Sequence, residues 1–174
     1  NEFIPQAEKY GFKVIVDYAF EPKAIEALYT VVTKLSPRRI IHVFGSTGGG
    51  RDKSRRFSVG EYVGKHADIV FVTDEDPYDD DPLEIMHDVS SAVEKKGKIP
   101  GKDLFLIEDR KEAIERAIVM AEAGDIVLVT GKGSEQGMCV AGGIIIPWDD
   151  RVVVREALSL RGGEKIEIHS LWSS

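Results

Sequence analysis

Cysteine is almost absent from the sequence, which limits what can hold the fold together. Cys139 has no second cysteine to pair with, so an internal disulfide is excluded and a reducing compartment is favoured. No apolar run approaches the roughly 20 residues that span a membrane, and no signal-peptide pattern is visible. We therefore expect a cytoplasmic protein with no membrane partner.

Positive charge is also in short supply. The 23 Lys and Arg residues are outnumbered by 30 Asp and Glu residues, which gives a net charge of −7 at pH 7. This balance argues against a nucleic-acid partner, because phosphate contacts need a basic face. The 4 histidines show no metal-ligand spacing, so we interpret them as structural and expect no metal site.

Apolar segments of strand length alternate with helical patterns along the chain. Apolar residues make up 43% of the 174, enough for the core of one domain, and we take 1–174 as a single domain. Strands that are apolar throughout, each followed by a helix, predict an α/β fold with a mostly parallel sheet covered on both faces. The strands are expected at 14–16, 40–44, 69–73, 104–107 and 126–130, and the helices at 22–35, 58–66, from 82, from 110 and at 150–160. Residues 143–147 are expected to be extended, and 165–169 to form a short edge strand or a tail.

A glycine-rich loop at 45–54, Gly-Ser-Thr-Gly-Gly-Gly-Arg-Asp-Lys-Ser, follows one of these strands and precedes a helix. This is the context of a nucleotide-binding loop, but no Gly-Lys-Ser/Thr ends it and Gly-x-Gly-x-x-Gly is not met cleanly. Arg51 and its basic neighbours suit a carboxylate or a phosphate. The alternative is a solvated basic turn.

Three further loops follow strands and should meet the glycine loop at one sheet edge. Acids crowd residues 74–81, where they would repel one another unless an ammonium group or a metal balances them; a solvated acidic loop is the alternative. Another of these loops is Gly131-Lys132-Gly133-Ser134-Glu135. Its glycines would let a ligand approach the backbone closely, and Glu135 could accept a hydrogen bond from an amine. The alternative is a simple glycine-rich turn. Asp17 either accepts from a ribose hydroxyl or caps the following turn.

These loops, in this order, resemble the C-terminal domain of the Mur ligases, most closely the MurE type, which adds the third residue of the peptidoglycan stem peptide. The resemblance covers about residues 14–158, and its individual pieces are weak while their combination is specific. The matching pieces are 16–19, 43–45 with 49–53, 72–73 with Pro77, 108–110 with 113–114, 124–125 with 127–128, 131–133 with Glu135, and 149–151.

The resemblance implies a Rossmann-like three-layer sandwich, with an antiparallel edge strand, that closes over a central ATPase domain. ATP and Mg²⁺ would activate the carboxylate of UDP-MurNAc-dipeptide as an acyl phosphate, and the amine of a free amino acid would attack it. The N-terminal and central domains, which bind most of the ATP and Mg²⁺, are expected to lie outside this chain, so no catalytic residue is assigned within it.

Site roles follow from the resemblance residue by residue. Arg51 would pair with the amino acid's carboxylate, Gly131 and Glu135 would hold its far end or its amine, and Asp17 would touch the nucleotide. The specificity pocket would be lined by Glu75, Asp76, Pro77 and Tyr78.

The chain departs from the family pattern at three places. Phe20 and Ser134 stand where histidines are usual, and Glu75-Asp76-Pro77-Tyr78 replaces the Asp-Asn-Pro-Arg of diaminopimelate-adding members. A buried carboxylate without its bidentate arginine would cost several kcal/mol. The acids instead suit a terminal ammonium, which predicts a diamino acid such as lysine or ornithine.

Other readings stay open. Another Mur-like amide ligase, of the folylpolyglutamate or cyanophycin synthetase type, is the nearest alternative, and a non-catalytic nucleotide- or amino-acid-binding module is the next. A Rossmann dehydrogenase is disfavoured, because no clean dinucleotide fingerprint follows the first strand.

Overall fold

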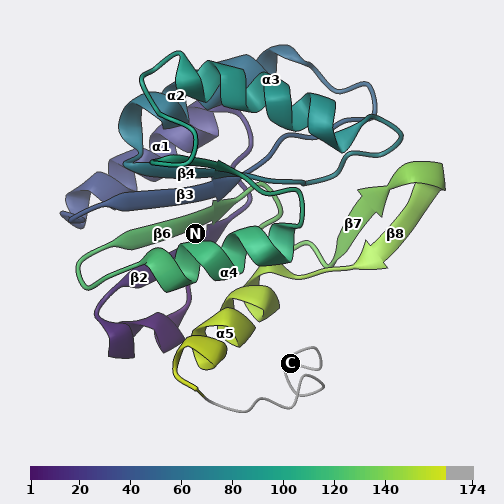
Figure 1. Ribbon diagram of the computed structural model, residues 1–174. Helices are drawn as coiled ribbons and strands as arrows, with labels where there is room; N and C mark the ends of the chain where they lie inside the picture. The colour runs from purple at the N-terminus through teal and green to yellow at the C-terminus, as the bar shows by residue number, and fades with distance from the viewer. Residues whose placement is uncertain (164–174) are drawn as a thin grey trace.

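The computed structural model describes residues 1–163, which form a six-stranded sheet with helices on both faces (Figure 1). The strands of this sheet are β1 (Glu2–Phe3), β2 (Lys13–Asp17), β3 (Ile40–Phe44), β4 (Ile69–Val72), β5 (Leu104–Leu106) and β6 (Ile126–Thr130). The helices are the short 3-10 helix η1 (Pro5–Tyr10), α1 (Pro22–Lys34), α2 (Ser54–His66), α3 (Pro82–Glu94), α4 (Arg110–Met120) and α5 (Asp150–Arg161).

The sheet has the order β1-β2-β6-β3-β4-β5, in which only β1 is antiparallel to its neighbour among the described strands. β6 lies between β2 and β3, and Val127 is in register with Val14 on one side and Ile41 on the other. The predicted α/β class, mostly parallel sheet and antiparallel edge strand are confirmed. The edge strand is β1, however, and the candidate at 165–169 lies outside the described residues.

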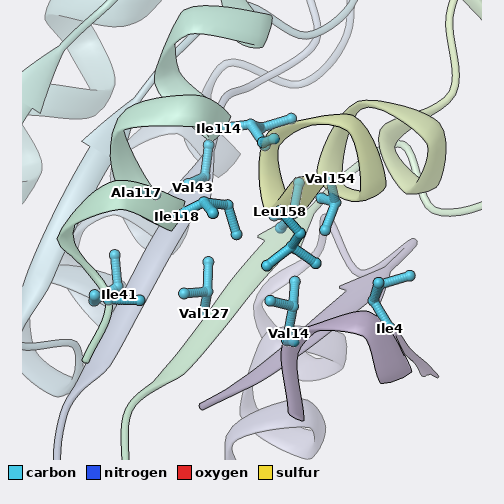
Figure 2. Close-up of a cluster of buried hydrophobic side chains, with 14 of the residues drawn as sticks. Ile4, Val14, Ile41, Val43, Ile114, Ala117, Ile118, Val127, Val154 and Leu158 are labelled. Atoms are coloured by element: carbon cyan, nitrogen blue, oxygen red, sulfur yellow. The ribbon is translucent and has the colours of Figure 1, made fainter. Parts of the chain in front are cut away.

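Alternate residues of the sheet face two separate cores, because successive side chains of a strand point to opposite faces. Val14 and Val127 pack with Ile114 of α4 and Leu158 of α5, as Figure 2 shows. Ile15 and its counterparts on the other strands pack under α1, α2 and α3. The sheet is thus the middle of three layers, and its carboxyl edge is left to loops.

Helices α3 and α4 begin at residues 82 and 110, as predicted, and an aspartate caps each of these starts. Asp81 accepts the N–H of Leu83 at 2.9 Å to begin α3, and Asp109 accepts the N–H of Lys111 at 2.9 Å to begin α4. Helix α2 begins at Ser54, about one turn earlier than predicted. Just before this start, Asp52 Oδ1 accepts the N–H of Ser54 at 2.9 Å. Among residues 1–163, no helix is long and apolar enough to cross a membrane.

An antiparallel hairpin projects from the carboxyl edge of the sheet (Figure 1). It joins β7 (Gly137–Val140) and β8 (Ile144–Pro147) through the short turn η2 (Ala141–Gly143). The sequence predicted an extended segment at 143–147 but not its partner. Ile145 of β8 packs over Gly137 of β7, and a side chain at Gly137 would collide with it.

Candidate functional site

A cavity of about 390 Å³ lies at the carboxyl edge of the sheet, where the loops after β2, β3, β4 and β6 meet. Parallel strands deliver their following loops to one edge, and this edge is where open α/β sheets bind ligands. The residues predicted from the sequence that line this cavity are Arg51, Glu75, Asp76, Tyr78, Gly131 and Glu135.

Two predicted residues lie elsewhere. Pro77 is buried behind the cavity, and its carbonyl accepts the N–H of Asp80 at 3.1 Å. Asp17 accepts the N–H of Ala19 at 2.8 Å, which is the turn-capping role, and lines a neighbouring cavity of about 420 Å³ with Ser134. A nucleotide role for Asp17 stays a prediction.

Glu75 is the most deeply buried acid of the cavity, with an exposed fraction of 2%. Its carboxylate accepts one long hydrogen bond, from Thr47 Oγ1 at 3.5 Å. Burial raises the pKa of Glu75 to about 7, while the nearby Arg110 opposes this rise and Asp76 adds to it. The cavity therefore holds a carboxyl group that changes charge near neutral pH.

Gly131 is required beside this carboxyl group. Its φ of 107° lies in the left-handed region that favours glycine, and a Cβ on Gly131 would overlap Glu75 Oε1. The first glycine of the Gly-Lys-Gly sequence thus lets the β6 loop approach the acidic loop after β4.

Lys132 supplies the cation that the acidic loop was predicted to need. Its Nζ donates to Asp76 Oδ1 at 2.8 Å, to Asp76 Oδ2 at 2.9 Å and to Glu135 Oε2 at 2.8 Å. The lysine side chain is 1% exposed. Sequence reasoning allowed an ammonium group or a metal at this place but did not assign Lys132, because its direction is visible only in the fold.

The glycine-rich loop uses its own N–H groups to join the acidic loop. Gly48 N–H donates to the carbonyl of Asp76 at 2.8 Å, and Gly49 N–H donates to Asp80 Oδ2 at 3.1 Å. The two loops therefore form one wall of the cavity. These two N–H groups are therefore not available to a phosphate.

Two arginines from the region of the glycine loop line the cavity. Arg55 already pairs with Glu21 at 3.0 Å and lies over the ring of Phe20, 5.3 Å from its centroid. Arg51 has no acidic partner within residues 1–163 and is exposed to the cavity. Arg51 is thus the cation that remains free to bind an anionic group of a ligand.

Tyr78 occupies the position at which the family pattern has an arginine. Its ring packs against Gly49, and its N–H donates to the carbonyl of Cys139 at 3.1 Å. The φ of Tyr78 is 53°, an uncommon conformation for a residue with a side chain. The cavity therefore has an aromatic wall at this place.

Arg110 holds the loops of the cavity together from below, a role that sequence reasoning missed. Its guanidinium forms a two-pronged ion pair with Asp150, at 2.9 and 2.8 Å. It also donates to the carbonyls of Asp74 at 3.1 Å and Thr130 at 3.0 Å. One buried side chain thus ties the ends of β4 and β6 to the start of α5.

The histidine at the centre of the sheet is structural, as predicted. His42 is bonded to Tyr29 through Nδ1 and to Thr130 through Nε2, both at 2.8 Å. Burial, with a smaller contribution from Arg110, lowers the pKa of His42 to about 3, so the ring stays neutral. Among the described residues, no group of three or more His, Cys, Asp or Glu side chains is placed to hold a metal ion.

The fold and the cavity define a Rossmann-like α/β domain with a cavity lined by charged residues at the carboxyl edge of its sheet. Residues 2–133 match the family described as "Mur ligase, glutamate ligase domain". The chain therefore belongs to the Mur ligase family and corresponds to its glutamate ligase domain.

The chain is similar both to proteins named as tripeptide synthetases and to proteins named as 2,6-diaminopimelate ligases. It is 39% identical over 156 residues to the UDP-N-acetylmuramyl-tripeptide synthetase of Borreliella burgdorferi, covering 89% of this chain and 30% of that protein. It is 42% identical over 151 residues to the protein of that name from Roseiflexus sp., covering 87% and 29%. It is 39% identical over 160 residues to the UDP-N-acetylmuramoyl-L-alanyl-D-glutamate--2,6-diaminopimelate ligase of Alkaliphilus metalliredigens, covering 91% and 31%.

A solved structure shares the fold. The structure of a UDP-N-acetylmuramoyl-L-alanyl-D-glutamate--2,6-diaminopimelate ligase superposes with a TM-score of 0.73 and 33% identity, covering 87% of this chain and 30% of that one. The chain thus spans about three tenths of the length of the relatives it matches.

Proposed function

We propose that this chain is the amino-acid-binding domain of an ATP-dependent ligase of the MurE type. The ligase joins a free amino acid to the peptide carboxylate of UDP-MurNAc-dipeptide, making the third residue of the stem peptide in peptidoglycan synthesis. One observation carries the proposal: a single cavity combines the unpaired cation of Arg51 with the carboxyl groups of Glu75, Asp76 and Glu135. A zwitterionic amino acid needs both kinds of group.

The residues of this domain bind and orient the amino acid. Arg51 pairs with its carboxylate, and the acids after β4 and β6 attract its amino groups. ATP would phosphorylate the peptide carboxylate and leave as ADP, and Mg²⁺, which the central domain would hold, would stabilise the phosphate charge. The amine of the bound amino acid would then displace phosphate from the acyl phosphate and lose a proton as the amide forms. ATP as a substrate and the unpaired Cys139 both fit a cytoplasmic enzyme.

We further propose that the amino acid is a diamino acid such as lysine or ornithine rather than diaminopimelate. Tyr78 stands where a second arginine would be needed, and Arg55 is already paired with Glu21. A second substrate carboxylate would be buried beside acids without a cation of its own, at a cost of about 2–5 kcal/mol.

Phosphate release by the full-length ligase, supplied with ATP, Mg²⁺ and UDP-MurNAc-dipeptide, tests both statements. We expect release that depends on lysine or ornithine, and a strong preference for meso-diaminopimelate would overturn the assignment of the amino acid. If lysine, ornithine and meso-diaminopimelate all fail to support phosphate release, the ligase assignment is overturned. The 174-residue chain alone is expected to ligate nothing, because the ATP-binding groups lie on other domains.

A matched pair of variants tests the role of Arg51. Arg51→Ala should raise the KM for the amino acid at least about tenfold, because a hydrogen bond to a charged group is lost. Lys53→Ala removes the same charge from the same loop, and Lys53 is exposed and does not line the cavity. Equal effects of the two substitutions would argue against a contact between Arg51 and the substrate.

A further inference from the structure

An apolar groove lies between α4 and the β4–β5 end of the sheet, and it shares no lining residue with the cavity at the carboxyl edge. Its volume is about 530 Å³. Phe71 and Phe105 line it with stacked rings whose centroids are 5.0 Å apart, and Val119 of α4 lines it from the other side. Val119 is 70% exposed, the highest fraction among the large apolar side chains of residues 1–163. The groove is therefore a surface that another segment can cover.

The groove exists because the helices cover the sheet unevenly. Within the described part of the chain, α1, α2 and α3 pack on one face, while α4 and α5 pack on the other. α4 lies over β3, β4 and β6, and β5 is the outermost strand at this end of the sheet. The part of this face formed by β5 thus lacks a helix of its own among residues 1–163, and Phe105 is left partly exposed.

The end of α5 is fixed beside this groove. Arg161, the last residue of α5, donates to the carbonyl of Ile118 at 2.6 Å and to the carbonyl of Val119 at 3.0 Å. Its guanidinium also lies over the rings of Tyr10 and Phe12, 5.2 Å from each centroid. Whatever follows α5 along the chain therefore starts next to a residue that lines the groove.

The sequence after α5 has the pattern of an extended segment with one apolar face. The φ of Gly163 is 73°, in the left-handed region, which lets the chain leave the helix. Residues 164–174 lie outside the described residues, and their sequence begins Glu-Lys-Ile-Glu-Ile-His. Ile166 and Ile168 would share one face of an extended chain, with Glu167 on the other. Residues 164–174 could span roughly 36 Å when extended, about twice the length of α4, so they can follow the whole groove.

We propose that residues 164–174 dock in this groove, with the face that carries Ile166 and Ile168 packed against Phe105 and Val119. The segment is tethered beside the groove, which gives it an effective concentration on the order of millimolar there. This favours it over the same segment of a second copy. The proposal does not depend on the ligase assignment or on the ligand cavity.

Cysteine trapping in the 174-residue chain tests the contact directly. In a Cys139→Ser background, Val119→Cys is paired in turn with Ile166→Cys, Glu167→Cys and Ile168→Cys, and disulfide formation under mild oxidation is followed on non-reducing gels. One of the two isoleucine positions should react at least about tenfold faster than position 167, because only side chains on the docked face approach closely enough to bond.

The pattern and the size of the product decide the outcome. Equal rates at the three positions would overturn the proposal, since the segment would then pass the groove without docking in it. A disulfide that joins two chains rather than one would also overturn it, because the groove would then hold a second copy.

Urea unfolding tests the same contact without new cysteines. Val119→Ser should raise the unfolding equilibrium constant at least about fivefold, because the docked segment would bury this side chain. The control is Val31→Ser in α1, where valine is 40% exposed against 70% at Val119. If the groove were open, the more exposed valine would cost less to replace, so an equal or smaller effect at Val119 would overturn the proposal.

A double-mutant cycle completes the unfolding test. In a chain that carries Ile166→Ser and Ile168→Ser, the effect of Val119→Ser should shrink to less than twofold, because the side chains that cover it are lost. Additive effects of the groove and segment substitutions would show that the two do not touch and would refute docking.

Discussion

The burial of Glu75 predicts that replacing it by glutamine stabilises the fold, in a way that depends on pH. The carboxyl group is 2% exposed, and it accepts one hydrogen bond, at 3.5 Å from Thr47. Its pKa rises from 4.5 to about 7 because burial disfavours the charged form. A carboxyl group of this kind costs stability whenever it must ionise inside the fold.

The size and sign of the effect follow from this shift. Between pH 4.5 and about 7 the folded chain keeps a proton that the unfolded chain releases, so stability falls as pH rises through this window. The rise in pKa corresponds to about 3 kcal/mol once Glu75 is ionised in both states. Glu75→Gln should therefore gain little stability near pH 5 and most of this amount above pH 8.

Urea unfolding of the 174-residue chain at pH 5 and pH 8.5 measures the difference. The gain from Glu75→Gln should be larger at pH 8.5 by about 2–3 kcal/mol. Glu94→Gln, at an exposed position of α3, removes the same charge and should show no such dependence. A gain of equal size at both pH values would refute the reasoning, because it would come from something other than ionisation.

The structure makes three more predictions. Arg110→Met should lower the free energy of unfolding by about 3–5 kcal/mol in denaturant titrations, because Asp150 is left as a buried, unpaired charge; a combined Arg110→Met and Asp150→Asn variant that is no more stable would contradict this reason. Gly131→Ala should also destabilise the fold, since alanine is strained at a φ of 107° and its Cβ would overlap Glu75 Oε1; an unchanged unfolding midpoint would show that the loop can move. Cys139 lines the cavity and is the chain's single cysteine, so millimolar lysine should slow its reaction with a thiol reagent; equal rates with and without lysine would place the ligand elsewhere.

The sheet was largely predictable because its strands carry a strong signal. The segments at β3, β4 and β6 are buried throughout and, apart from His42 and Thr130, apolar, and each lies within one residue of its predicted bounds. β1 is two residues long, too short for any periodicity, and its pairing with β2 is decided by tertiary structure. The hairpin strand β7 mixes glycine, methionine and cysteine, so its sequence has no clear alternation.

The site was predictable by residue type but not by pairing. Loops that follow parallel strands must share an edge, and this rule brought Arg51, Glu75 and Glu135 to one cavity. The partners of Lys132 and Arg110 depend on side-chain direction across loops that are distant in sequence. The segment 131–135 was therefore interpreted through its glycines and its acid, whereas the lysine between them proves to be the centre of the charge network.

The strand order also decides when the cavity can form during folding. β6 is the last strand of the main sheet along the chain, yet it lies between β2 and β3, which come early. Until residues 126–130 have been made, β2 and β3 lack the neighbour that joins them, and long-range pairing of this kind is slow. A nascent or truncated chain that stops before β6 exposes strand edges and carries an incomplete cavity. Binding of the proposed amino acid by this domain would therefore report that its central strand has been inserted.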